Sequence, residues 1–92
     1  MAKFTISKPY TMPIENVREA AEGLATQLEK EHGVKSQWRG DHHVHIKGKG
    51  VEGEMDFADG VIDISVKLGM MTAMFAPVMK KEMQRYLDKY VT

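Results

Sequence analysis

The pattern of apolar and polar residues changes its period several times along this chain, and each period predicts one kind of element. From Lys3 to Lys8 the two kinds of residue alternate, with Phe4 and Ile6 on one face. A period of two is typical of a strand with one buried face. Because proline has no N–H group to donate to a neighbouring strand, Pro9 is expected to end this one.

After the strand, apolar residues recur at steps of three and four, which predicts an amphipathic helix of about five turns. Thr11 is expected to cap this helix, with Pro13 in its first turn, where a proline loses no helical hydrogen bond. Gly33 is expected to end the helix in a left-handed turn. The apolar stripe consists of Ile14, Val17, Ala21, Leu24 and Leu28.

From Val34 to Leu68 the period returns to two and predicts four antiparallel strands joined by three turns. Asp59-Gly60 suits a type I′ turn, Gly48-Lys49 a type II′ turn, and Arg39-Gly40-Asp41 a three-residue loop. These turns keep one apolar face in register, which a slip of one residue would break. The expected pairs are Phe57–Ile62, Met55–Ile64 and Gly53–Val66 in the last hairpin, Ile46–Val51 and Val44–Gly53 in the second, and Trp38–His42, Ser36–Val44 and Val34–Ile46 in the first.

The segment from Gly69 to Met83 holds five of the eight methionines and leads into a second helix. This helix begins either near Thr72 with a kink at Pro77, or at Ala76, and it ends near Tyr90. Helical steps of three and four predict which side chains it buries. They are Met79, Met83, Tyr86 and Tyr90.

The order strand, helix, four strands, helix predicts an α+β fold, β-α-β-β-β-β-α, as a single domain over residues 1–92. Both helices are expected on one face of the antiparallel sheet, an arrangement that looks like a shortened helix-grip fold. A chain of this length buries only about 60–65% of its unfolded surface. With so small a core, a homodimer is expected.

Charge and composition exclude several classes of protein. The 13 basic and 13 acidic residues cancel, and no basic stripe of the kind that binds nucleic acid is present. With no cysteine there is neither a disulfide framework nor a cysteine-bound zinc. Neither a signal peptide nor a run of about 20 apolar residues long enough to span a membrane occurs. We therefore expect a cytoplasmic protein.

The polar face of the predicted sheet carries the only candidate chemistry. His43 is expected opposite Glu54 and His45 opposite Glu52, so the two histidines could share a metal with a glutamate. We favour cross-strand pairs on a solvated face, because nothing is expected to cover it. Asp56 opposite Asp63 is likewise read as a hydrated pair rather than a catalytic one. With no nucleophile elbow, phosphate loop or dinucleotide fingerprint either, we expect neither an enzyme nor a cofactor.

The apolar residues that lead into the second helix are the candidate binding surface. Methionine is flexible and polarizable, so clusters of it fill irregular cores or line adaptable surfaces. The segment either covers one end of the sheet, or is buried in a homodimer, or binds an apolar partner. The candidate residues are Met70, Met71, Met74, Phe75 and Val78, with Lys80, Lys81 and Arg85 as flanking basic residues.

Over nearly its whole length the chain resembles the polyhydroxyalkanoic acid system proteins, a family of small bacterial proteins. The resemblance is carried by HGVKSQWRGD after the first helix, by VEGEMDFADGVIDISVKLGMM, and by PVMKKEMQRYLDKY at the end. It implies a role at polyhydroxyalkanoate storage granules, either on the granule surface or on a granule protein. It supplies no catalytic residues.

Two further hypotheses belong to other classes. One is a carrier of a small apolar or lipid-like ligand, with a pocket between the sheet and the C-terminal helix. The residues expected to line that pocket are Trp38, Val44, Met55, Ile64 and Met79. The other is metal binding through His43 and His45.

Overall fold

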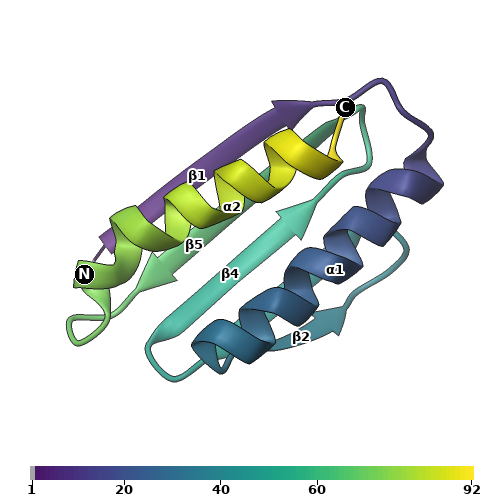
Figure 1. The fold of residues 1–92 in the computed structure, drawn as a ribbon. Helices are drawn as coiled ribbons and strands as arrows, with labels where there is room; N and C mark the ends of the chain where they lie inside the picture. The colour runs from purple at the N-terminus through teal and green to yellow at the C-terminus, as the bar shows by residue number, and fades with distance from the viewer. Residues whose placement is uncertain (1) are drawn as a thin grey trace.

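The computed structural model describes residues 2–92, and the order of its elements confirms the predicted α+β fold. A five-stranded antiparallel sheet carries both helices on one face, and the helices run in opposite directions across it (Figure 1). The elements are β1 (Ala2–Pro9), α1 (Ile14–His32), β2 (Lys35–Trp38), β3 (His43–Gly48), β4 (Val51–Asp56), β5 (Val61–Leu68), the short 3₁₀ helix η1 (Ala73–Phe75) and α2 (Ala76–Tyr90).

The strand order β1-β5-β4-β3-β2 places the first strand beside the last. Strand β1 pairs with β5 along its whole length, from Ala2 opposite Leu68 to Pro9 opposite Val61. Side chains alternate between the faces of a sheet, so every second residue points at the helices. In β4 and β5 these inward residues are buried, while the residues between them are exposed or half-buried.

The last hairpin has the predicted register, with Met55 opposite Ile64 and Gly53 opposite Val66. The register of the second hairpin was predicted wrongly by two residues. Ile46 pairs with Gly53, and the turn is Lys49-Gly50 rather than Gly48-Lys49. The left-handed residue is Gly50, at φ 78°, whereas Gly48 is a strand residue. A β-carbon at Gly48 would lie 2.9 Å from the Cα of Val34, the residue before β2, so the close approach of the chain at that point requires glycine.

The register of the first hairpin was also predicted wrongly, again by two residues. Trp38 pairs with Val44 rather than with His42. The N–H of Arg39 donates to the carbonyl of His43 at 2.8 Å, so the loop is Gly40-Asp41-His42. A shift of two residues leaves every side chain on its predicted face, which is why the predicted core survives both errors.

Helix α1 begins and ends close to the predicted residues, but Thr11 does not cap it. Pro13 occupies the N-cap position without a side-chain hydrogen bond, and the Thr11 hydroxyl donates to the carbonyl of Thr92 at 3.0 Å. Gly33 ends the helix at φ 68°, with its N–H donating to the carbonyl of Glu29, as predicted. Ile14 is only half-buried, and the rest of the predicted stripe is buried together with Ala20 and Ala25.

Helix α2 begins at Ala76, directly after η1, and so follows the second of the two predicted starts. Its buried residues are Met79, Met83 and Leu87. The predicted face was therefore partly wrong, because Tyr86 is half-buried and Tyr90 is 48% exposed. The three buried residues follow at steps of four, which keeps them over the sheet.

The core lies between the sheet and the two helices. No polar or charged residue is buried among residues 2–92. Small side chains at Ala20, Ala21 and Ala25 let α1 lie close to its neighbours. Neither helix in this part of the chain is long and apolar enough to cross a membrane.

Candidate functional site

Five apolar side chains around the start of α2, four of them before its first residue, are exposed in a fold that buries most others. Together they form what we call the Met-rich patch. Their exposed fractions are 88% for Met70, 89% for Met71, 76% for Met74, 51% for Phe75 and 54% for Val78. They do not cover the end of the sheet, so that interpretation of the segment was wrong. Soluble domains normally bury side chains of this size in clusters, and an exposed group of them indicates a binding surface.

The segment that carries the patch is fixed to the turn between β3 and β4. The carbonyl of Gly50 accepts hydrogen bonds from the N–H of Gly69 at 2.9 Å and from the hydroxyl of Thr72 at 2.6 Å. The carbonyl of Thr72 in turn accepts from the N–H of Phe75 at 2.9 Å. The backbone of the patch is therefore held in place although its side chains are exposed.

The predicted basic residues lie just beyond the patch on α2, and Lys80, Lys81 and Arg85 are all exposed. Val78, Lys81 and Arg85 follow at steps of three and four, so they share one outer side of the helix. Lys80 lies outside that line. A surface that contacts the Met-rich patch would therefore meet positive charge immediately beside it.

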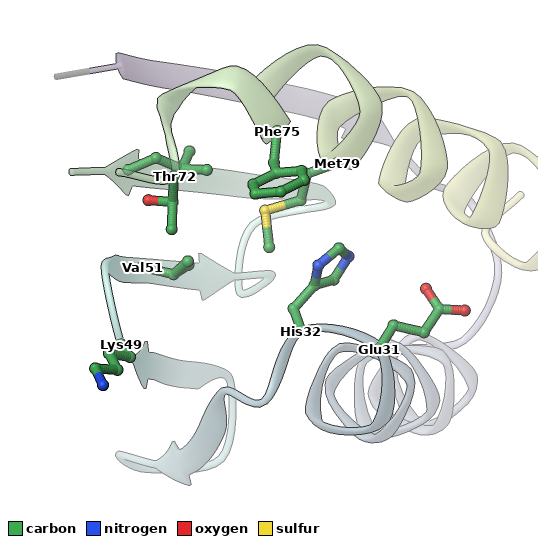
Figure 2. Close-up of a pocket in the computed structure, with 8 residues that line it drawn as sticks. Glu31, His32, Lys49, Val51, Thr72, Phe75 and Met79 are labelled. Carbon is green, nitrogen blue, oxygen red and sulfur yellow. The ribbon is translucent and has the colours of Figure 1, made fainter. Parts of the chain in front are cut away.

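A cavity of about 350 Å³ opens beside the patch, between the end of α1 and the start of α2. Its apolar walls are formed by Val51, Leu68, Phe75 and Met79. Figure 2 shows the Phe75 ring and the Met79 side chain facing Val51 across this space, with the His32 ring on the α1 side. The sequence pattern does not indicate this cavity, because the cavity depends on how far apart the two helices lie at this end.

Three groups able to hold a metal ion lie together beside the cavity: Glu31 and His32, which line it, and Glu82 of α2. Ligand atoms of Glu31, His32 and Glu82 all lie within 4.8 Å of one another. Nε2 of His32 is 3.3 Å from a carboxylate oxygen of Glu82, which links the two helices. Sequence reasoning missed this group, because Glu82 is 50 residues from His32 and no spacing rule relates them.

The histidines predicted on the open face of the sheet are near carboxylates, but with different direct partners. His43 lies opposite Asp56 rather than Glu54, and His45 opposite Glu54 rather than Glu52. Each still approaches its expected glutamate diagonally, with 3.7 Å between Nε2 and the nearest oxygen in both cases. Among residues 2–92 these side chains do not form a three-residue metal group.

Asp56 is the carboxylate on this face whose pKa is clearly perturbed. A hydrogen bond from the N–H of Ala58 is the main cause that lowers the pKa of Asp56, and a bond to the His43 ring lowers it further. Both interactions favour the charged carboxylate. Asp56 does lie opposite Asp63, as predicted, and the hydroxyl of Ser7 donates to Asp63. Both carboxylates are exposed and hydrogen-bonded.

The residues predicted to line a carrier pocket fill the core instead. Val44, Met55 and Ile64 are at most 1% exposed. The rings of Trp38 and Phe57 pack edge to face, with 6.0 Å between their centroids. Of the predicted lining residues, Met79 alone borders the cavity beside the patch.

A family model described as "Putative polyhydroxyalkanoic acid system protein" matches residues 4–91. No curated protein and no solved structure matches the chain. The matched range contains the Met-rich patch, the cavity and the charged groups beside it.

Proposed function

Since the chain belongs to the polyhydroxyalkanoic acid system protein family, we propose that it docks on the apolar surface of polyhydroxyalkanoate granules through the Met-rich patch. The role is non-enzymatic and belongs to the cytoplasmic granule. The observation that carries the proposal is the exposure of five apolar side chains on one short segment that is itself hydrogen-bonded in place.

The chemistry of the patch suits a polymer surface. Polyhydroxyalkanoate is an aliphatic polyester, so its surface is irregular, mostly apolar and without a fixed pattern of hydrogen-bond donors. Methionine side chains adapt to such a surface because they are flexible and polarizable. Removing exposed apolar area from water stabilises the contact by about 25 cal/mol per Å².

The basic side chains beside the patch add a second, weaker contribution. Lys80, Lys81 and Arg85 would lie near the carboxylate chain ends of the polymer or other anions on the granule. At physiological salt the Debye length is about 8 Å, so the attraction between exposed charges is largely screened beyond that distance. Raising the salt concentration should therefore weaken docking without abolishing it.

The test is co-sedimentation of the purified protein with isolated granules, either intact or stripped of their proteins. The triple variant Met71→Ser/Met74→Ser/Phe75→Ser should lose binding to both while keeping its fold, because all three side chains are exposed. Tyr90→Ser is the matched control, since Tyr90 is an exposed apolar side chain at the other end of α2. This control should bind like the wild type.

Other occupants of the patch give different results. Binding to intact granules alone would identify a granule protein as the partner and overturn direct docking on the polymer. A dimer in sedimentation equilibrium that becomes monomeric in the triple variant would show that a second copy covers the patch. Equal binding by the triple variant and the wild type would overturn the assignment of the patch itself.

A further inference from the structure

We propose that the cavity between the two helices binds a short segment of uncharged aliphatic ester chain. This inference rests on the proposed function, because it takes its ligand from the polymer on which the protein docks. The protein would then hold one polymer chain in the cavity while the Met-rich patch lies on the surface around it.

The size and lining of the cavity fit one such chain. At about 350 Å³ it is at the lower end of the range of roughly 300–1,000 Å³ in which ligand pockets fall. Val51, Leu68 and Met79 are core residues that are at most 8% exposed, so the floor of the cavity belongs to the packed core. A flexible thioether on one wall and the Phe75 ring on another can adjust to a chain of varying shape.

The charges around the cavity favour a ligand without charge. Glu31 and the His32–Glu82 pair lie on one side, and Lys49 on the other. Figure 2 shows the Lys49 amine pointing away from the apolar walls, so it is not placed to pair with a buried carboxylate. Burying a carboxylate without a partner costs several kcal/mol more than burying an ester. The half-buried His32 ring also lines the cavity, and a ring N–H there could donate a hydrogen bond to an ester carbonyl.

The cavity is continuous with the Met-rich patch, because Phe75 belongs to both. Neighbouring Thr72 also borders the cavity, and its hydroxyl fixes the segment to Gly50. A chain that leaves the granule surface under the patch would therefore reach the cavity without crossing open water.

The test is a titration followed by amide NMR, with the methyl ester of β-hydroxyoctanoic acid and the free acid as the two probes. The ester should cause saturable shifts centred on Val51, Leu68, Phe75 and Met79. The free acid should bind at least roughly tenfold more weakly, because its carboxylate would be desolvated without a partner. Equal binding of the two probes, or saturable shifts centred elsewhere, would overturn the proposal.

Two variants separate this inference from docking. Val51→Phe fills the cavity and should abolish the ester shifts while granule co-sedimentation continues. Met70→Ser/Met71→Ser should weaken co-sedimentation and leave the ester shifts intact, since neither residue lines the cavity. If Val51→Phe does not give a folded spectrum, Phe75→Ala tests the ester shifts alone, because Phe75 lines the cavity but also belongs to the Met-rich patch and so says nothing about docking by itself. Ester binding that survives removal of this wall, or that falls in Met70→Ser/Met71→Ser, would overturn the proposal.

Discussion

The hydroxyl of Tyr86 on α2 donates a hydrogen bond to the carbonyl of Ala20 on α1, at 2.9 Å, and so joins the two helices that cover the sheet. Gly23 lies directly under this contact, and a β-carbon there would be 2.3 Å from the Tyr86 oxygen. Burial of the ring, together with the nearby Tyr90, raises the pKa of Tyr86 above 10.0. The glycine in the middle of α1 is therefore explained by a side chain more than sixty residues away.

Removing the hydroxyl should reverse the effect of a substitution at Gly23. Tyr86→Phe should cost about 0.5–1.5 kcal/mol, because one hydrogen bond is lost. In that background Gly23→Ala should gain about 0.5–1 kcal/mol, since alanine is the better helix former. In the wild type the same change should be neutral or destabilising, because the tyrosine must move. Urea unfolding of the four proteins measures this coupling, and additive effects would contradict it.

Asp56 should make the stability of the fold depend on acid pH. The folded-state pKa of Asp56 lies below 3.8, so the charged carboxylate stabilises the fold above that value. This stability is lost as pH falls through the folded-state pKa. Asp56→Asn should therefore lower the melting temperature at pH 7. At a pH low enough to protonate Asp56 in both the folded and the unfolded wild type, the variant and the wild type should melt at the same temperature.

The cause of the Asp56 shift can be tested separately. The bond from the N–H of Ala58 is the largest single cause, and the His43 ring lowers the pKa of Asp56 both by a hydrogen bond and by its charge. The variant His43→Ala should therefore reduce the acid dependence but keep the part that the Ala58 bond supplies. A variant that loses the dependence completely would show that the histidine, and not the backbone, holds the carboxylate in its charged form.

Two side chains in the last turn of α2 should respond very differently to truncation. Leu87 is 1% exposed, so Leu87→Ala should cost about 2–5 kcal/mol. Tyr90 was predicted to share the buried face but is 48% exposed, so Tyr90→Ala should cost less than about 1 kcal/mol. Chemical denaturation of both variants measures the difference. If the two variants lost similar amounts of unfolding free energy, Tyr90 would belong to the buried face, as the spacing predicts.

The sequence predicted element type and the faces of the sheet well, because both follow from periods within a single element. Its errors fell where two elements meet. Turn positions depended on which glycine is left-handed, Gly50 rather than Gly48. The buried face of α2 depended on α1, because the Tyr86 hydroxyl bonds to the carbonyl of Ala20 on α1. Leu87, rather than Tyr86, is therefore buried over the sheet.

The same distinction applies to the candidate site. The Met-rich patch was visible in the sequence because its residues are neighbours along the chain. The cavity was not visible in the sequence, because its lining residues Val51, Leu68 and Met79 come from three different elements. His32 and Glu82 meet only because the two helices lie side by side.

Thr72 should control how firmly the Met-rich patch is held. Thr72→Val keeps the shape of the side chain but removes the bond to the Gly50 carbonyl, a loss of about 1 kcal/mol. That carbonyl still accepts from the N–H of Gly69, so global stability should change little. Local opening should become more frequent, and the amide of Phe75, which donates to the carbonyl of Thr72, should exchange faster with deuterium.

If a fixed patch matters for docking, the same variant should bind granules several-fold more weakly, because the segment must then be ordered on contact. Thr26→Val on α1 is the matched control, since it removes a hydroxyl that bonds only the carbonyl of Glu22 within its own helix. Its exchange at Phe75 and its granule binding should both equal those of the wild type. Faster exchange at Phe75 in Thr72→Val with unchanged binding would show that the methionines need only be exposed, and that the polymer surface itself orders them.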